Sequence, residues 1–180
     1  MSCSSVTVSS GIHTDSGLAV TEEQDIVYRG EERVPRGAPS VQAPTSATGG
    51  FAAAPPTGAA PLSGPLPWSR SIVADEVMLF RYSALTYNGH RIHYDLPYAS
   101  GVEGYPALVV NGGLVTLMLY ELLRSHADPA VRRMSSRNMR PLFAGRPIRL
   151  EGEPVQGGAR LQVLDDSSAV AISAQVEWAS

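Results

Sequence analysis

The sequence contains a single cysteine, Cys3, and no run of 18 consecutive apolar residues. One cysteine excludes an internal disulfide and a cysteine-based zinc site, and without a long apolar run we expect no membrane span. The first twenty residues have neither a basic nor an apolar segment, so we expect no secretory signal peptide. The formal charge of −3 is too small to indicate a nucleic-acid or membrane partner. These absences favour a cytoplasmic protein.

The composition is otherwise that of a folded domain with an unusual insertion. Of 180 residues, 43% are apolar, which is enough for one core. Eight of the 14 prolines fall between residues 30 and 67, among glycine, alanine, serine and threonine. Such a segment buries too little apolar surface to offset its ordering entropy. We therefore interpret residues 30–67 as a linker between residues 1–29 and a domain at 68–180.

The segment before the linker has a hairpin pattern. Residues 5–9 alternate β-branched and small polar side chains, and residues 18–29 end in Ile26, Val27 and Tyr28. We expect two strands separated by a turn over residues 11–17. Two strands are not stable alone in water, so they need a sheet from elsewhere.

The domain after the linker combines one helix with several strands. Residues 72–79 fit a strand or a short helix, whereas residues 108–124 predict a clear helix, apolar on most faces and therefore buried. Gly112 and Gly113 lie at its start, with Asn111 as a possible N-cap. Four strands are expected at 131–140, 147–154, 160–164 and 170–178, joined as a meander. This order predicts an α+β fold, an antiparallel sheet wrapped around one long central helix.

Polar side chains cluster just before that helix, in residues 88–93. In extended chain His90 and His93 face opposite ways, but in an irregular loop they can converge; the ordinary interpretation is one exposed histidine and one bonded to a backbone carbonyl. Two histidines without further ligands, apart from Asp95, predict no metal site. The glycine pair at the helix start has ordinary and functional interpretations too: a simple turn, or unpaired N–H groups that polarise a carbonyl oxygen.

Three segments together resemble a known family. They are FRYSALTYNGHRIHYD at residues 80–95, EGYPALVVNGGL at 103–114, and TEEQDIVYR at 21–29. They resemble the MaoC-like (R)-specific enoyl thioester hydratases and dehydratases, which have the hot-dog fold. Within that family, they are similar to the branch of mesaconyl-CoA and itaconyl-CoA hydratases and type 2 3-hydroxyacyl-thioester dehydratases. The resemblance implies that residues 1–29 correspond to the end of a preceding hot-dog repeat.

The resemblance also implies a set of site residues. The family motif Asp-x-Asn-x-x-His places His93 at the histidine position, Asn88 at the aspartate position and His90 at the asparagine position. Asparagine orients water but takes no proton, so His93, or His93 with His90, would do the acid–base work. The thioester would bind at a group of residues near the helix start and the loop before it, namely Asn111, Gly112, Gly113, Tyr105 and Arg91. Asn111 departs from the His-Gly-Pro that the branch usually has.

The implied function is reversible hydration of an enoyl thioester carried by CoA or an acyl carrier protein, with no cofactor. Arg91 and Arg137 are candidates for a substrate carboxylate or phosphate, although a solvated surface charge is the ordinary interpretation of each. A lone hot dog leaves a sheet edge open, so we expect a homodimer or pairing with a second hot-dog chain. Two other interpretations remain: a thioesterase using Glu121, and a non-catalytic partner subunit or thioester-binding protein.

Overall fold

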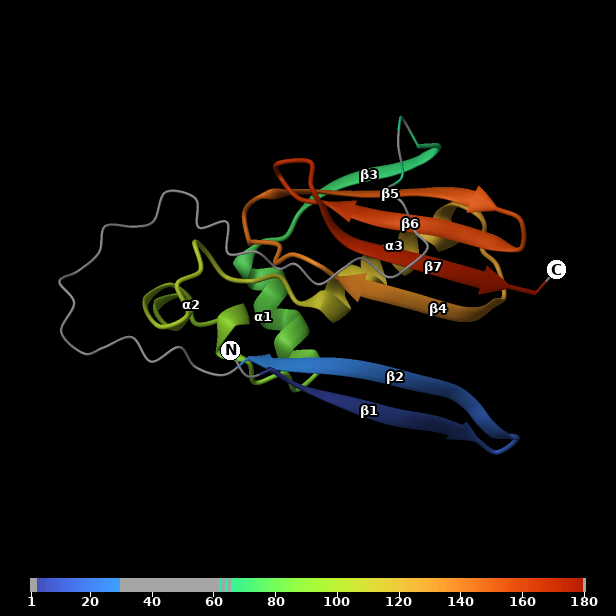
Figure 1. Cartoon of the computed structure of the whole chain (residues 1–180), viewed down its shortest axis with the longest axis horizontal. Coiled ribbons are helices and arrows are strands. Elements are labelled where there is room, and N and C mark those ends of the chain that lie inside the picture. The colour runs from blue at the N-terminus through green and yellow to red at the C-terminus, as the bar shows by residue number, and fades with distance from the viewer. Residues whose placement is uncertain (1–2, 30–61, 63, 65, 180) are drawn as a thin grey trace. The chain divides into compact units, whose positions relative to one another are not determined.

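The structure is a computed structural model that describes residues 3–29, 62, 64 and 66–179. Its elements are β1 (Cys3–Thr14), β2 (Gly17–Arg29), β3 (Trp68–Val73), α1 (Glu76–Leu85), the 3-10 helix η1 (Arg91–His93), α2 (Leu96–Gly101), α3 (Gly112–His126), β4 (Val131–Asn138), β5 (Pro147–Val155), β6 (Gly158–Leu164) and β7 (Val170–Trp178) (Figure 1). β1 and β2 belong to one compact unit and all other elements to a second. The expected linker at residues 30–67 lies outside the described residues, apart from 62, 64, 66 and 67.

The predicted hairpin is confirmed, but its turn is shorter than expected. β1 and β2 pair antiparallel from Cys3 opposite Arg29 to Thr14 opposite Gly17. Residues 11–14, expected in the turn, continue β1 because they pair with residues 17–21. The turn itself is Asp15–Ser16, where the Ser16 N–H donates to the Thr14 hydroxyl at 3.3 Å.

The second unit contains a five-stranded antiparallel sheet in the order β3-β5-β6-β7-β4 (Figure 1). The four strands expected after Pro129 are all present. The expected meander is wrong at its first step, because β4 pairs with β7 at the opposite edge from β3. The connection between β4 and β5 is held instead by residues 108–110, through Val110 N–H to Leu142 O and Ala144 N–H to Leu108 O.

The undecided stretch at residues 72–79 contains both a strand end and a helix start. β3 ends at Val73, and α1 begins at Glu76 after Asp75 as its N-cap. The Asp75 carboxylate accepts a hydrogen bond from the Met78 N–H at 2.7 Å, which satisfies one of the free donors of the first turn. α1 therefore starts close to the sheet and leads directly to the histidine-bearing loop.

α3 is the central helix, and it is confirmed with a later start than expected. It begins at Gly112 because residues 108–110 are extended, with Val109 bridged to Phe143. Its buried face consists of Val115, Leu119, Leu122 and Leu123. The expectation of a helix buried on most faces is wrong, since Leu117 is 58% exposed.

The buried face of α3 packs against the inner face of the sheet, and this confirms the α+β prediction. The inner face consists of alternate residues of the three central strands: Ile148, Leu150, Ala159, Leu161, Val163, Ile172, Ala174 and Val176. At the far end of the helix, His126 stacks on Trp68 of β3 with ring centroids 5.4 Å apart. No helix among the described residues is long and apolar enough to cross a membrane.

Two leucines of α3 test which face of the helix is buried. Leu119 is fully buried and Leu117 is mostly exposed. Leu119→Ala should lower the free energy of unfolding by about 2–5 kcal/mol because it leaves a cavity in the core. Leu117→Ala, the matched control, should change it by less than about 0.5 kcal/mol. Urea unfolding of both variants makes the comparison, and equal losses would contradict this assignment of faces.

Candidate active site

The histidine-bearing loop is folded by its own hydrogen bonds. α1 ends at Leu85, and the Asn88 N–H donates back to the Ser83 carbonyl at 2.9 Å. The Asn88 side-chain oxygen then accepts from the His90 N–H at 3.1 Å. Asn88 thus shapes the loop with its oxygen, and its Nδ2 has no hydrogen-bond partner among the described residues, so it can donate to another acceptor such as a water molecule.

His93 is the buried histidine of the pair. It is 7% exposed, and its Nδ1 lies 2.7 Å from the carbonyl oxygen of Val109. A carbonyl only accepts, so Nδ1 must hold the proton, and Nε2 of the neutral ring has a lone pair available. Burial holds the pKa of His93 below its ordinary value of 6.5; the bond to Val109 opposes this, and the nearby His90 adds to it. Neutral His93 is therefore suited to act as a base.

His90 lies beside His93 and faces solvent. The two ring centroids are 6.3 Å apart and the planes are inclined by 27°. The loop thus brings together the two imidazoles that extended chain would have separated. The ordinary interpretation, one exposed histidine and one bonded to a carbonyl, describes their environment, and the same geometry also places two acid–base groups side by side.

Residues 108–111 connect this loop to the start of α3. The Val109 N–H donates to Ile92 O at 2.9 Å, and the Val109 carbonyl accepts from His93. Two residues later, Asn111 is the N-cap position of α3. Three residues span at most about 11 Å, so the Val109 backbone that holds the imidazole of His93 lies within about that distance of Gly112, the first residue of α3.

The N-cap side chain does not cap the helix. Asn111 is 1% exposed, and its Nδ2 donates to the Ser83 hydroxyl of α1 at 3.2 Å. Its Oδ1 has no hydrogen-bond partner among the described residues. The ordinary interpretation of Asn111 as a capping residue is therefore wrong for its side chain, and the N–H groups of the first turn are not satisfied by it.

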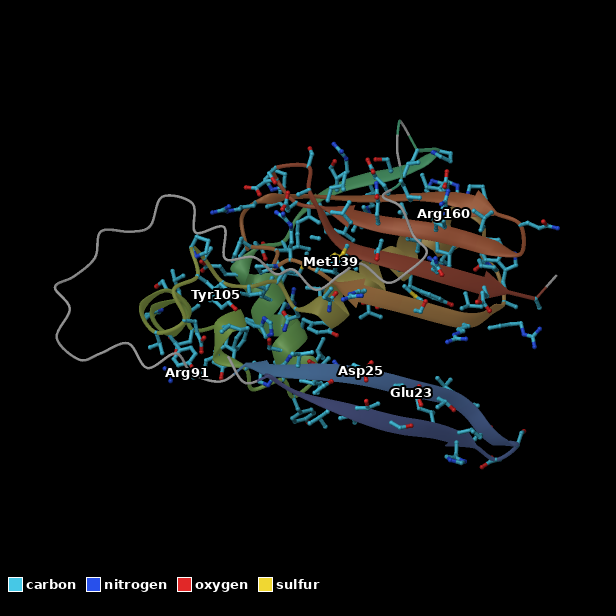
Figure 2. The ribbon with its side chains drawn as sticks, in the orientation of Figure 1. Glu23, Asp25, Arg91, Tyr105, Met139 and Arg160 are labelled. Carbon is cyan, nitrogen blue, oxygen red and sulfur yellow. The ribbon has the colours of Figure 1, made fainter. Side chains whose placement is uncertain are left out.

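Arg91 and Tyr105 lie at the outer end of the site, near α2 (Figure 2). Arg91 donates to the Asp95 carboxylate through Nε at 2.9 Å and Nη2 at 2.7 Å, and its guanidinium stacks 4.1 Å from the ring of Tyr98. This pairing holds the pKa of Asp95 below its ordinary value. Arg91, Tyr105 and His90 border an open depression of about 390 Å³, together with Gly89, Ile92, Tyr98 and Glu103.

Two other candidates are placed differently: one side chain is on the outer face of the sheet, and the other lies farther along α3. In β4, Asn138 pairs with the core residue Ile172, so its neighbour Arg137 projects from the outer face of the sheet. Glu121 is nine residues beyond Gly112 on α3, or about 13 Å along the axis, and it is ion-paired with Arg124 at 2.9 Å. Neither side chain lies where the two histidines do.

No three His, Cys, Asp or Glu side chains in the described ranges are grouped as a metal ion would require.

Sequence reasoning missed three residues around α3's first turn: Tyr82, Ser83 and Asn138. Tyr82 and Ser83 lie in the segment 80–95 that carries the family resemblance, but neither was assigned a role in the site. Asn138 shows no signal in the sequence, because only the pairing of β4 places it there.

Comparisons with known proteins agree on one family. The family model described as hydroxyacyl-thioester dehydratase type 2 matches residues 2–144. The mesaconyl-C(4)-CoA hydratase of Chloroflexus aurantiacus is 42% identical over 172 residues, which cover 96% of this chain and 55% of the relative. The chain thus spans about half the length of that relative.

Solved structures show the same fold at low identity. A MaoC-like dehydratase from Phytophthora capsici matches with a TM-score of 0.69 and 14% identity, over 97% of this chain and 56% of that one. An (R)-hydratase from A. caviae matches with a TM-score of 0.55 and 15% identity, over 62% of this chain and 92% of that one. The hot-dog fold expected from the sequence is thereby confirmed.

The environment of His93 predicts its titration. Burial should place its midpoint below 6.5, and the bond to Val109 should keep the neutral ring in the Nδ1–H tautomer. Nitrogen-15 NMR of the imidazoles, assigned with His93→Asn, measures both. Because the unfolded chain takes up this proton first as the pH falls, folded-state stability should decrease below about pH 6.5. A midpoint above 6.5 or an Nε2–H tautomer would contradict the assignment.

Proposed function

The chain belongs to the hydroxyacyl-thioester dehydratase type 2 family, and we propose that it catalyses the reversible hydration of a 2-enoyl thioester to a 3-hydroxyacyl thioester. The observation that supports this most directly is the bond between His93 Nδ1 and Val109 O, 2.7 Å long. It leaves Nε2 of a buried, neutral imidazole as a proton acceptor close to the donor-rich end of α3. Hydration needs both groups, a base for water and donors for the thioester oxygen.

In the proposed reaction, His93 activates the water. Nε2 takes one proton from the water while its oxygen bonds to C3 of the substrate, and Asn88 Nδ2 helps to orient that water. The electron pair of the C2–C3 double bond moves toward C1, so negative charge develops on the thioester oxygen. The proton then returns to C2 from the imidazolium, with His90 assisting, and the sum is addition of one water molecule.

The first turn of α3 stabilises the developing oxyanion. The N–H groups at Gly112 and Gly113 lie at the positive end of a 15-residue helix. Because the Asn111 side chain does not cap these donors, a ligand oxygen can accept from them. Donors that are fixed before the charge develops need no reorganisation during the reaction, and for this reason they favour the transition state over the ground state.

The substrate is a thioester of CoA or of an acyl carrier protein. The relative from Chloroflexus aurantiacus is named for a CoA thioester, and its identity of 42% supports the same class of substrate here. The depression bordered by His90, Arg91, Tyr98 and Tyr105 lies beside the proposed base and would accommodate part of the substrate. Arg91 contributes mainly shape there, because Asp95 already neutralises its charge.

Hydrolysis of the thioester is less compatible with the geometry. The carboxylate considered for that reaction, Glu121, lies about 13 Å along α3 from the first turn and is engaged by Arg124. Its exposed ion pair holds the pKa of Glu121 below its ordinary value, so it is a weak base. Among the residues that the structure describes, the candidate bases near the helix start are His93 and His90.

We further propose that the domain pairs with a second hot-dog domain, either of an identical chain or of another protein. β3 and β4 are edges of the sheet in the described chain, and each has one side of unpaired backbone groups. Light scattering of the purified protein tests this at micromolar concentration. A mass of one chain alone, with no higher mass when candidate partners are added, would refute the pairing.

His93→Ala should lower kcat/KM by about 10²–10⁴-fold, because it removes a positioned base. The assay follows loss of the conjugated absorbance of crotonyl-, mesaconyl- and itaconyl-CoA, with free thiol monitored in parallel. His13→Ala, a change at an exposed histidine of β1, serves as the control and should leave activity unchanged.

The pH profile gives a second readout. Activity should rise with pH through a midpoint below 6.5 and be flat at neutral pH, since the base must be unprotonated. Release of thiol would indicate hydrolysis instead of hydration. Full activity of His93→Ala would show that the base lies elsewhere.

A further inference from the structure

Ser83 contacts two parts of the site that are distant from each other in the sequence. It lies on α1 and is only 5% exposed. Its carbonyl oxygen accepts from the Asn88 N–H at 2.9 Å, and its hydroxyl oxygen accepts from Nδ2 of Asn111 at 3.2 Å. One buried residue therefore bonds both to the histidine-bearing loop and to the N-cap position of α3.

We propose that Ser83 is a positioning residue for the hydration reaction. Its hydroxyl holds the Asn111 side chain away from the first turn of α3 and so keeps the N–H groups there available to the thioester oxygen. This inference rests on the proposed function and adds a residue to the same site. Ser83 acts through Asn111 and does not itself touch the substrate.

The other α-helices of this unit show what the Asn111 side chain would do without that bond. At the N-caps of α1 and α2, the carboxylates of Asp75 and Asp95 accept from the N–H three residues later, at 2.7 and 3.1 Å. Asparagine caps helices as well as aspartate does, and Asn111 has the extended backbone of an N-cap residue, with ψ at 126°. Residue type and backbone therefore both favour capping, and the bond to Ser83 is what opposes it.

The buried oxygen of Asn111 is the atom that capping would use. Asn111 is 1% exposed, and its Oδ1 has no hydrogen-bond partner among the described residues. An unpaired acceptor beside the unpaired donors of a helix start would gain stability by turning toward them. The amide group is planar, so the bond from Nδ2 to Ser83 also fixes the direction of Oδ1.

Release of Asn111 would affect a donor that the proposed reaction uses. An N-cap oxygen accepts from the N–H two or three residues later, which here belongs to Gly113 or Leu114. Gly113 is one of the two residues whose N–H groups are proposed to stabilise the oxyanion. The substrate oxygen would then have to displace the cap before it could bind there.

The test compares three variants of the full chain. Ser83→Ala removes the hydroxyl and keeps a residue that favours helix. Ser83→Ala/Asn111→Ala also removes the oxygen that could cap the helix. Ser125→Ala is the matched control, because this serine lies at the other end of α3 and its hydroxyl donates within the same helix, to Leu122 O at 2.8 Å.

Ser83→Ala should lower kcat/KM for crotonyl-CoA by about 5–30-fold relative to Ser125→Ala, the ratio that corresponds to the strength of a side-chain cap. Its midpoint of thermal unfolding should not fall, because the new cap compensates for the lost bond. The double variant should recover most of the activity. A purely structural serine would instead give a lower midpoint and no recovery, and either result in a folded protein would show that the proposal is wrong.

Hydrogen exchange of the main-chain amides, followed by NMR without ligand, gives a readout that does not depend on turnover. In Ser83→Ala the N–H of Gly113 or Leu114 should exchange about 5–30-fold more slowly than in the wild type, and in the double variant it should not. Slower exchange in a protein that hydrates no enoyl thioester would overturn the proposed function and support the action of Ser83 on Asn111. Unchanged exchange at both amides would overturn the action of Ser83.

Discussion

The site depends on one short piece of extended backbone, residues 108–111. Hydrogen bonds from Val110 to Leu142 and from Ala144 to Leu108 fix it against the connection between β4 and β5. The same piece holds His93 through the Val109 carbonyl and α1 through the Asn111 side chain. This backbone segment therefore fixes the position of the base, His93, relative to the start of α3, although the two come from separate parts of the sequence.

The start of α3 is less stable than a capped helix start, and its first N–H groups remain available to a ligand. A buried amide oxygen without a hydrogen-bond partner lowers the stability of the fold by about 1–3 kcal/mol. The Oδ1 of Asn111 is such an atom, and capping of the helix by this oxygen would have avoided the loss. Unsatisfied groups of this kind are often retained where a ligand later uses them. Farther along the helix the core is well packed, and Leu119 and Leu123 are fully buried.

Local patterns in the sequence predicted most elements, and pairing between distant segments accounts for what they missed. The hairpin, the central helix and four strands follow from periodicity and turn residues, and the motif at residues 88–93 identified the histidines. The position of β4 beside β7 has no local signal, and this pairing decides that Asn138 faces the helix while Arg137 faces away. The exposure of Leu117 likewise depends on which face of α3 the sheet covers, which apolar spacing does not reveal.

The acceptor that fixes the tautomer of His93 is a main-chain carbonyl, and this has an evolutionary consequence. No codon specifies that oxygen, so a substitution at position 109 cannot remove it as long as the backbone there stays extended. In enzymes whose histidine is oriented by a carboxylate, one nucleotide change can abolish the orienting group. Here the orientation is inherited with the fold itself, so the neighbouring side chains can diverge while the base keeps its proton on the same nitrogen.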